Sequence, residues 1–116
     1  TGFHIDCHGS SVWYHVLQGE KVFFLIPPTE LNILTYEKYL HDSKDFTFFG
    51  DRVEKCTRVI IKAGQTLMLP AGWMHSVFTP VDSLVFGGNF IHARSLRMQM
   101  RIIQHENNLD INKHEK

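Results

Sequence analysis

The chain has 116 residues, of which 43% are hydrophobic and 12% aromatic, so it is long enough for one domain with a buried core. Twelve Lys and Arg residues balance twelve Asp and Glu residues. This balance excludes the basic field that drives sequence-independent nucleic-acid binding. Cys7 and Cys56 are too few for a disulfide scaffold or a zinc finger, and they favour a reducing compartment. No apolar run approaches the length of a membrane span, and we expect neither membrane insertion nor a secretion signal.

Strands are predicted where apolar and polar residues alternate and where Gly, Pro or Asp ends the alternation. Seven such segments have the spacing of an antiparallel sheet protein: residues 1–6, 12–18, 21–26, 58–62, 66–69, 75–78 and 84–90. Gly19 and Glu20 form a short turn between the second and third segments, and we expect these two to pair as a hairpin. Gly87 and Gly88 predict a bulge or a close backbone approach in the last segment.

Two helices are predicted from apolar residues at helical spacing. Thr29 is placed to cap the first helix. A second helix is expected from Ser95 onward. The apolar positions that define the two helices are Leu31, Leu34 and Leu40 in the first, and Leu96, Met100 and Ile103 in the second. We therefore predict a mainly β domain over residues 1–105, with one inserted helix and a C-terminal helix, followed by a polar tail over 106–116 that is expected to fray.

His4, Asp6 and His75 are the candidate metal ligands. His4 and Asp6 lie two residues apart on a predicted strand, so their side chains project from the same face. Together with His75, which follows a tight turn, they match the two-histidine, one-carboxylate triad that leaves positions open on Fe(II). An HxD pair also occurs by chance, and a structural or surface role for these side chains stays open from spacing alone.

Tyr14 and Lys21 are expected to share one face if the hairpin forms. If that face is the interior of a barrel, Lys21 is an inward-pointing cation that needs an anion, and a dicarboxylate cosubstrate would supply one. The alternatives are an exposed turn lysine and a core aromatic. Asn89 either points toward the same pocket or is a buried amide satisfied by the backbone.

Several motifs together resemble the JmjC histone lysine demethylases, in the branch whose JmjC domain accompanies PHD fingers or an F-box with a CXXC zinc finger. The resemblance covers most of the chain, roughly residues 1–100, with the motifs in register from end to end. These motifs are Thr1-Gly-Phe-His-Ile-Asp6, Ser10-Ser-Val-Trp-Tyr-His15, Gly19-Glu-Lys21, Leu25-Ile-Pro-Pro-Thr29, Phe49-Gly-Asp51, Pro70-Ala-Gly-Trp-Met-His75, Thr79-Pro80 and Phe86-Gly-Gly-Asn-Phe90.

The resemblance implies a double-stranded β-helix of the cupin or jelly-roll type that holds Fe(II) through His4, Asp6 and His75. It further implies that Thr1, Tyr14 and Lys21 bind the far carboxylate of 2-oxoglutarate, with O2 as the second cosubstrate. The implied activity is demethylation of methyl-lysine on a histone H3 tail, by hydroxylation of the N-methyl group with release of formaldehyde and succinate. A nuclear location and a role in chromatin and transcription regulation follow from the same resemblance. We also expect the catalytic core to be partial, with the upstream strands of the barrel outside this sequence.

The first motif departs from the TDFHxDFGG pattern that is usual in this branch, at Gly2, Cys7 and His8. The expected metal ligands are kept, but an acidic and an aromatic side chain are lost, which affects the contacts expected for a methylated lysine. Two alternatives therefore stay open: a JmjC protein hydroxylase, and a non-catalytic JmjC chromatin-binding module.

Overall fold

The computed structural model describes residues 2–6, 9–41 and 49–114. Its elements in chain order are β1 (Ser11–Gln18), β2 (Glu20–Ile26), α1 (Glu30–His41), the 3-10 turn η2 (Phe49–Asp51), β3 (Thr57–Lys62), β4 (Thr66–Leu69), β5 (Met74–Phe78), β6 (Leu84–Phe90), the 3-10 turn η3 (Ala93–Ser95) and α2 (Leu96–His114). Among the described residues, no helix is long and apolar enough to cross a membrane.

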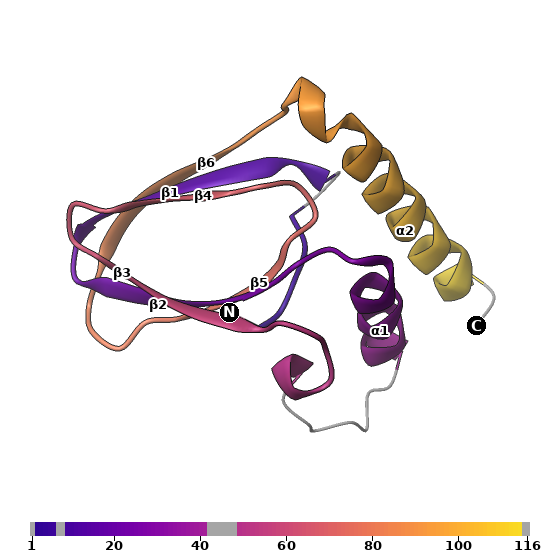
Figure 1. Ribbon diagram of the computed structural model, residues 1–116, viewed down its shortest axis with the longest axis horizontal. Helices are drawn as coiled ribbons and strands as arrows, with labels where there is room; N and C mark the ends of the chain where they lie inside the picture. The colour runs from indigo at the N-terminus through magenta and orange to yellow at the C-terminus, as the bar shows by residue number, and fades with distance from the viewer. Residues whose placement is uncertain (1, 7–8, 42–48, 115–116) are drawn as a thin grey trace.

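The strands form two antiparallel sheets of three strands, in the orders β4-β1-β6 and β3-β2-β5. Figure 1 shows the two sheets as opposite layers, with both helices at one end of them. The predicted fold class is confirmed: the chain is mainly β and has the two-sheet form of a jelly-roll core.

The expected hairpin between β1 and β2 is wrong, because the two strands belong to different sheets. Gly19 is the corner where the chain passes from one sheet to the other, with a φ of 82°. A Cβ there would lie 2.6 Å from the carbonyl oxygen of Asp82, so only glycine fits. The N–H of Glu20 donates to the Ser83 hydroxyl, which lies before β6. This contact replaces the pairing across the turn that a hairpin would need.

The expected first strand, residues 1–6, is also wrong over the part that the structure describes. Residues 2–6 contain only a single bridge, in which the backbones of His4 and His75 exchange two hydrogen bonds of 3.0 Å. His75 is the second residue of β5, and the chain turns just before it at Gly72, with a φ of 83°.

The alternation predicted for the first segment is nevertheless kept. Phe3 and Ile5 pack against an apolar cluster at the helical end of the molecule. His4 and Asp6 are both near His75, away from that cluster. Alternate residues therefore serve the core and the candidate site, as the sequence pattern predicts.

Two apolar clusters form the core. The first fills the space between the sheets and consists of Val12, Val16, Phe23, Leu25, Ile61 and Leu69. The second lies between the sheets and the helices and consists of Ile26, Ile33, Tyr36, Phe49, Met74 and Ile102. Met74 belongs to the second cluster and directly precedes His75 on β5. The candidate ligand His75 therefore follows directly after a residue of this cluster.

Gly87 is required by the close approach of the β1 backbone, and Gly88 lies against the Trp13 side chain. A Cβ on Gly87 would lie 2.9 Å from the carbonyl oxygen of Trp13, and one on Gly88 would lie 2.9 Å from the Trp13 ring nitrogen. The close-backbone-approach interpretation is therefore confirmed for Gly87, and the register irregularity of this strand pair lies elsewhere, between Val16 and Gln18.

The predicted cap of α1 is confirmed, because the Thr29 hydroxyl accepts a hydrogen bond of 3.1 Å from the N–H of Asn32. Both predicted helices are present, although the apolar residues from which they were predicted are exposed. Leu31, Leu34 and Leu40 of α1 are exposed, as are Leu96, Met100 and Ile103 of α2. Helix α2 also continues through residues 106–114, where a frayed tail was expected.

The helices are joined both by the second apolar cluster, which contains Ile33 and Tyr36 of α1 and Ile102 of α2, and by polar pairs. Arg101 of α2 forms a two-pronged ion pair with Glu30 of α1, at 2.8 Å. The His105 ring lies 2.9 Å from the Glu37 carboxylate and is buried. Of these four side chains His105 is buried, whereas Glu30 is largely exposed, so the Glu30–Arg101 ion pair lies at the surface.

Asn32 joins α1 to the segment before β3, and its loss is expected to destabilise the fold. Its side-chain amide donates to the carbonyl oxygens of Pro27 and Glu54 and accepts from the N–H of Glu54, in a fully buried setting. Asn32→Ala leaves these backbone groups unpaired, so we expect a loss of about 2–3 kcal/mol in urea denaturation. Asn107→Ala, which removes an exposed amide on α2, is the control and should change stability little. A loss no larger than that of Asn107→Ala would contradict this assignment.

Candidate metal centre

His75 presents a free ring nitrogen inside the protein. Its side chain is fully buried, and its Nδ1 lies 3.0 Å from the carbonyl oxygen of Trp73. Because a carbonyl oxygen only accepts, Nδ1 carries the ring proton and Nε2 keeps a lone pair. Nε2 is buried and has no hydrogen-bond partner among the described residues. A buried acceptor of this kind is costly unless something binds to it.

His4 repeats this arrangement on the neighbouring segment. Its Nδ1 lies 2.9 Å from the carbonyl oxygen of Gly2, which again leaves Nε2 as the free nitrogen. The bridge between the two backbones brings the ring centroids of His4 and His75 to 4.2 Å. A backbone carbonyl that fixes the ring and its tautomer is the usual support for a metal-binding histidine.

The Asp6 carboxylate lies between these two nitrogens. One of its oxygens is 3.8 Å from Nε2 of His4, and the other is 3.8 Å from Nε2 of His75. Both separations are too long for a hydrogen bond, so Asp6 does not satisfy either ring. One ligand atom from each of the three residues lies within 4.8 Å of the others. The donor set of two imidazoles and a carboxylate fits a divalent transition metal such as Fe(II).

The pKa of His75 lies below its ordinary value. Burial is the main cause, and the nearby His4 ring lowers the pKa further, while the hydrogen bond to Trp73 and the charge of Asp6 oppose the shift. His75 is therefore neutral at physiological pH, which is the form of histidine that binds a metal.

A cavity of about 210 Å³ opens beside these side chains. It is lined by His4, Tyr14, Lys21, Phe23, Val77 and Val85. Tyr14 and Lys21, which the sequence predicted to share a face, thus meet in one cavity, although no hairpin joins their strands. They meet because β1 and β2 lie in facing sheets and both residues point into the space between them.

Lys21 is the cation of this cavity, and it is half-buried. Its Nζ donates a hydrogen bond of 2.6 Å to the hydroxyl of Thr79. In the described part of the chain, the structure gives Lys21 no carboxylate partner. The cavity therefore offers a positive charge that an anionic ligand could neutralise.

Tyr14 adds a neutral donor to the cavity. Its ring packs against Phe23, with the centroids 5.3 Å apart. Burial, and secondarily the negative charge of Asp6, raise the pKa of Tyr14 above its ordinary value. The phenol is therefore protonated at physiological pH and can donate its proton in a hydrogen bond.

Residues 1–97 match the family described as the cupin-like domain. The chain belongs to the cupin-like domain family. This match covers both sheets and all three candidate metal ligands.

Curated relatives extend this finding. The chain is 55% identical over 111 residues to JmjC domain-containing histone demethylation protein 1 of Caenorhabditis elegans. The aligned residues make up 96% of this chain and 10% of that protein. It is 50% identical over 112 residues to lysine-specific demethylase phf2 of Danio rerio, with the same coverage, and 53% identical over 107 residues to lysine-specific demethylase 2B of Mus musculus, covering 91% of this chain and 8% of that protein. The resemblance to JmjC histone demethylases is confirmed. The chain spans about a tenth of the length of these relatives.

The sequence analysis of this cupin-like chain also singled out residues outside the metal cluster and the cavity. Thr1, Cys7 and His8 lie outside the described residues. Asn89 is exposed and donates a 2.8 Å hydrogen bond to the Ser10 hydroxyl, so neither expectation for it is met. Thr79 was not among the candidate site residues. The signal that could have identified it is the period of two through His75, Val77 and Thr79, which places all three on one face.

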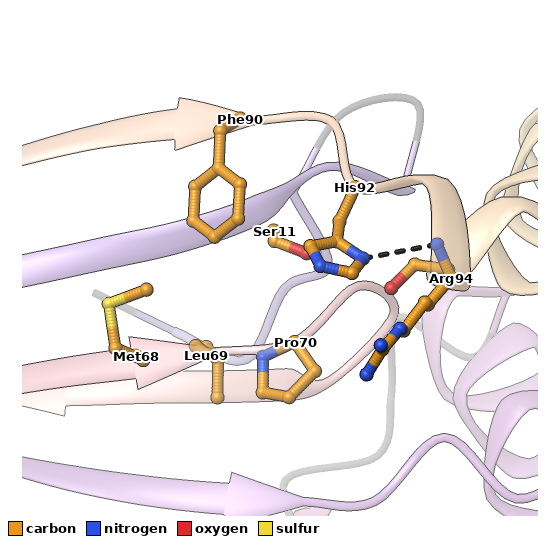
Figure 2. Close-up of a pocket in the computed structure, with 8 residues that line it drawn as sticks. Ser11, Met68, Leu69, Pro70, Phe90, His92 and Arg94 are labelled. Atoms are coloured by element: carbon orange, nitrogen blue, oxygen red, sulfur yellow. Dashed lines mark hydrogen bonds between the residues drawn. The ribbon is translucent and has the colours of Figure 1, made fainter.

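A larger cavity of about 270 Å³ lies elsewhere, near the ends of β4 and β6 (Figure 2). Its lining is mostly apolar and includes Met68, Pro70 and Phe90. The His92 ring is used locally, because its Nδ1 accepts a 3.1 Å hydrogen bond from the N–H of Arg94, two residues further on. Among the described residues, this lining holds one histidine and no carboxylate or thiol. It lacks the donors for a metal, so the smaller cavity is the candidate site.

Proposed function

We propose that this chain is part of the catalytic core of an Fe(II)- and 2-oxoglutarate-dependent dioxygenase that demethylates methyl-lysine on histone H3. The observation that carries the proposal is the cluster of His4, Asp6 and His75, with its unpaired buried nitrogen, beside a cavity that contains an unneutralised lysine. The relatives named lysine-specific demethylases support the substrate class. A histone H3 tail as partner, and the nucleus as location, belong to the same proposal.

In this proposal His4 and His75 hold Fe(II) through Nε2 and Asp6 holds it through its carboxylate. When bound, the metal would supply the oxidising chemistry that hydroxylates the N-methyl group: one oxygen atom of O2 enters that group, and the other enters 2-oxoglutarate as it loses CO2 and becomes succinate. The hydroxylated methyl group is lost as formaldehyde.

The chain's own residues bind and orient the cosubstrate. Lys21 holds the far carboxylate of 2-oxoglutarate by charge, and the protonated Tyr14 hydroxyl donates a hydrogen bond to it. Thr1 is proposed as a third contact, on the family resemblance alone. Phe23, Val77 and Val85 form the apolar part of the lining, which excludes water from the cosubstrate and strengthens the charge interaction with Lys21.

The test of the function is an assay of the protein with methylated histone H3 peptides, Fe(II), 2-oxoglutarate and O2. We expect formaldehyde and succinate to form together, and the peptide to lose the mass of one CH2 unit, because a hydrogen replaces the N-methyl group. A peptide that instead gains one oxygen and keeps it would identify a protein hydroxylase. A folded protein that binds the peptide but forms no succinate would identify a non-catalytic binding module and overturn the proposal.

Lys21→Met is expected to weaken the binding of 2-oxoglutarate specifically. It keeps most of the side-chain volume but removes the charge, so we expect the KM for 2-oxoglutarate to rise about 10- to 100-fold. Lys62→Met is the matched control, since Lys62 ends β3 of the same sheet and is exposed. Equal KM values for Lys21→Met and the wild type would contradict the role of Lys21 in this cavity.

A further inference from the structure

Thr79 lies directly after β5 and continues the inner face of that strand. His75 and Val77 precede it at alternate positions, and strand side chains alternate between faces. Val77 lines the cavity of about 210 Å³, and Thr79 is the next residue on that side, close to Lys21. Thr79 itself is exposed and does not line the cavity, so any effect on a ligand would act through Lys21.

The contact between these two side chains is short and direct. Nζ of Lys21 donates to the Thr79 hydroxyl at 2.6 Å, across 58 positions of sequence. A lysine ammonium has three N–H donors on a flexible four-carbon stem. The hydroxyl uses one donor and fixes the head of the stem, and this leaves the other donors for a ligand in the cavity.

Among the described residues, Thr79 is the partner that the structure gives to this ammonium. A neutral hydroxyl can orient a charge without neutralising it, whereas a carboxylate in its place would compete with an anionic ligand. The arrangement therefore keeps Lys21 both positioned and available.

We propose that Thr79 is a positioning residue that fixes the Lys21 ammonium for the far carboxylate of a 2-oxo dicarboxylic acid, and so helps the site to discriminate against 2-oxo monocarboxylic acids. This proposal rests on the proposed function, because it assumes that the cavity takes 2-oxoglutarate. Loss of the hydroxyl leaves the lysine stem free to adopt other rotamers, which must be ordered again when the ligand binds.

The test uses Thr79→Val, which keeps the branched shape and removes the hydroxyl, and Thr79→Ser, which restores the hydroxyl. Thr57→Val is the matched control, because Thr57 is an exposed threonine on β3 of the same sheet. Each protein is loaded with Fe(II) without oxygen and titrated with 2-oxoglutarate or with 2-oxopentanoate, which has the same chain length but no far carboxylate. The dissociation constants come from the visible charge-transfer absorption of the complex, and circular dichroism checks the fold.

We expect Thr79→Val to raise the Kd for 2-oxoglutarate about tenfold and to leave the Kd for 2-oxopentanoate unchanged. Thr79→Ser and Thr57→Val should both behave as the wild type. An unchanged Kd for 2-oxoglutarate in Thr79→Val, or an equal loss for both acids, would overturn the role of Thr79 while the proposed function stands. A wild-type protein that binds neither acid would overturn both proposals.

Discussion

His4→Ala is expected to remove tight Fe(II) binding while the chain stays folded. The His4 side chain is 40% exposed, and its bridge to His75 uses only backbone groups, which alanine retains. The variant leaves one imidazole and one carboxylate for the metal. Because loss of a supporting partner alone typically costs 10- to 100-fold in metal affinity, loss of a ligand should cost more than about a hundredfold. Anaerobic titration calorimetry with Fe(II) measures this change directly.

His15→Ala is the matched control for the histidine. His15 lies on β1, and its ring contacts the Thr66 hydroxyl at 2.7 Å, away from the candidate metal ligands. This variant should bind Fe(II) as the wild type does. If His4→Ala and His15→Ala bound the metal equally well, the ion would have to be held by other residues.

Phe49→Ala is expected to cause the largest loss of stability. Phe49 is almost fully buried, and its ring contacts those of Phe3, Tyr36 and Tyr39 at centroid distances of 5.4, 5.7 and 4.8 Å. Truncation leaves a cavity among these rings and removes their aromatic contacts. We expect the free energy of unfolding to fall by about 3–5 kcal/mol in urea denaturation.

Phe78→Ala provides the comparison for this loss. Phe78 ends β5 and is 58% exposed, so its truncation should change the free energy of unfolding by less than about 1 kcal/mol. A similar loss in both variants would mean that Phe49 is not the centre of a packed aromatic cluster.

The cluster around Phe49 is also connected to the candidate site, because Phe3 and Ile5 pack against it while His4 and Asp6 alternate with them along the chain.

Burial in this cluster raises the pKa of Tyr36 to about 12, with a smaller contribution from Tyr39. The Tyr36 hydroxyl is therefore neutral at physiological pH, so no charge is buried in the second cluster.

Local features of the chain were predictable from sequence because they depend on neighbouring residues. The alternation through residues 84–90 and the turn residues after 66–69 predict β6 and β4 with their observed bounds. The same alternation predicts that His4 and Asp6 share a face, and the structure brings both to His75.

Features that depend on distant partners were not predictable. A period of two identifies the face of a strand but not its neighbour, so Gly19 suggested a hairpin where the chain changes sheets. The leucines of α1 predicted a helix but not its buried face, which consists of Asn32, Ile33 and Tyr36. The face on which Thr79 lies was predictable from the period of two, but its contact with Lys21 was not, because the two residues lie 58 positions apart.

The most direct test of the proposed metal centre is anaerobic titration of the wild-type protein with Fe(II) and 2-oxoglutarate. We expect a weak visible charge-transfer band that saturates at one metal ion per chain and disappears when Zn(II) replaces Fe(II). A protein that is folded by circular dichroism and gives no such band would contradict the assignment of His4, Asp6 and His75 as an iron site that takes 2-oxoglutarate.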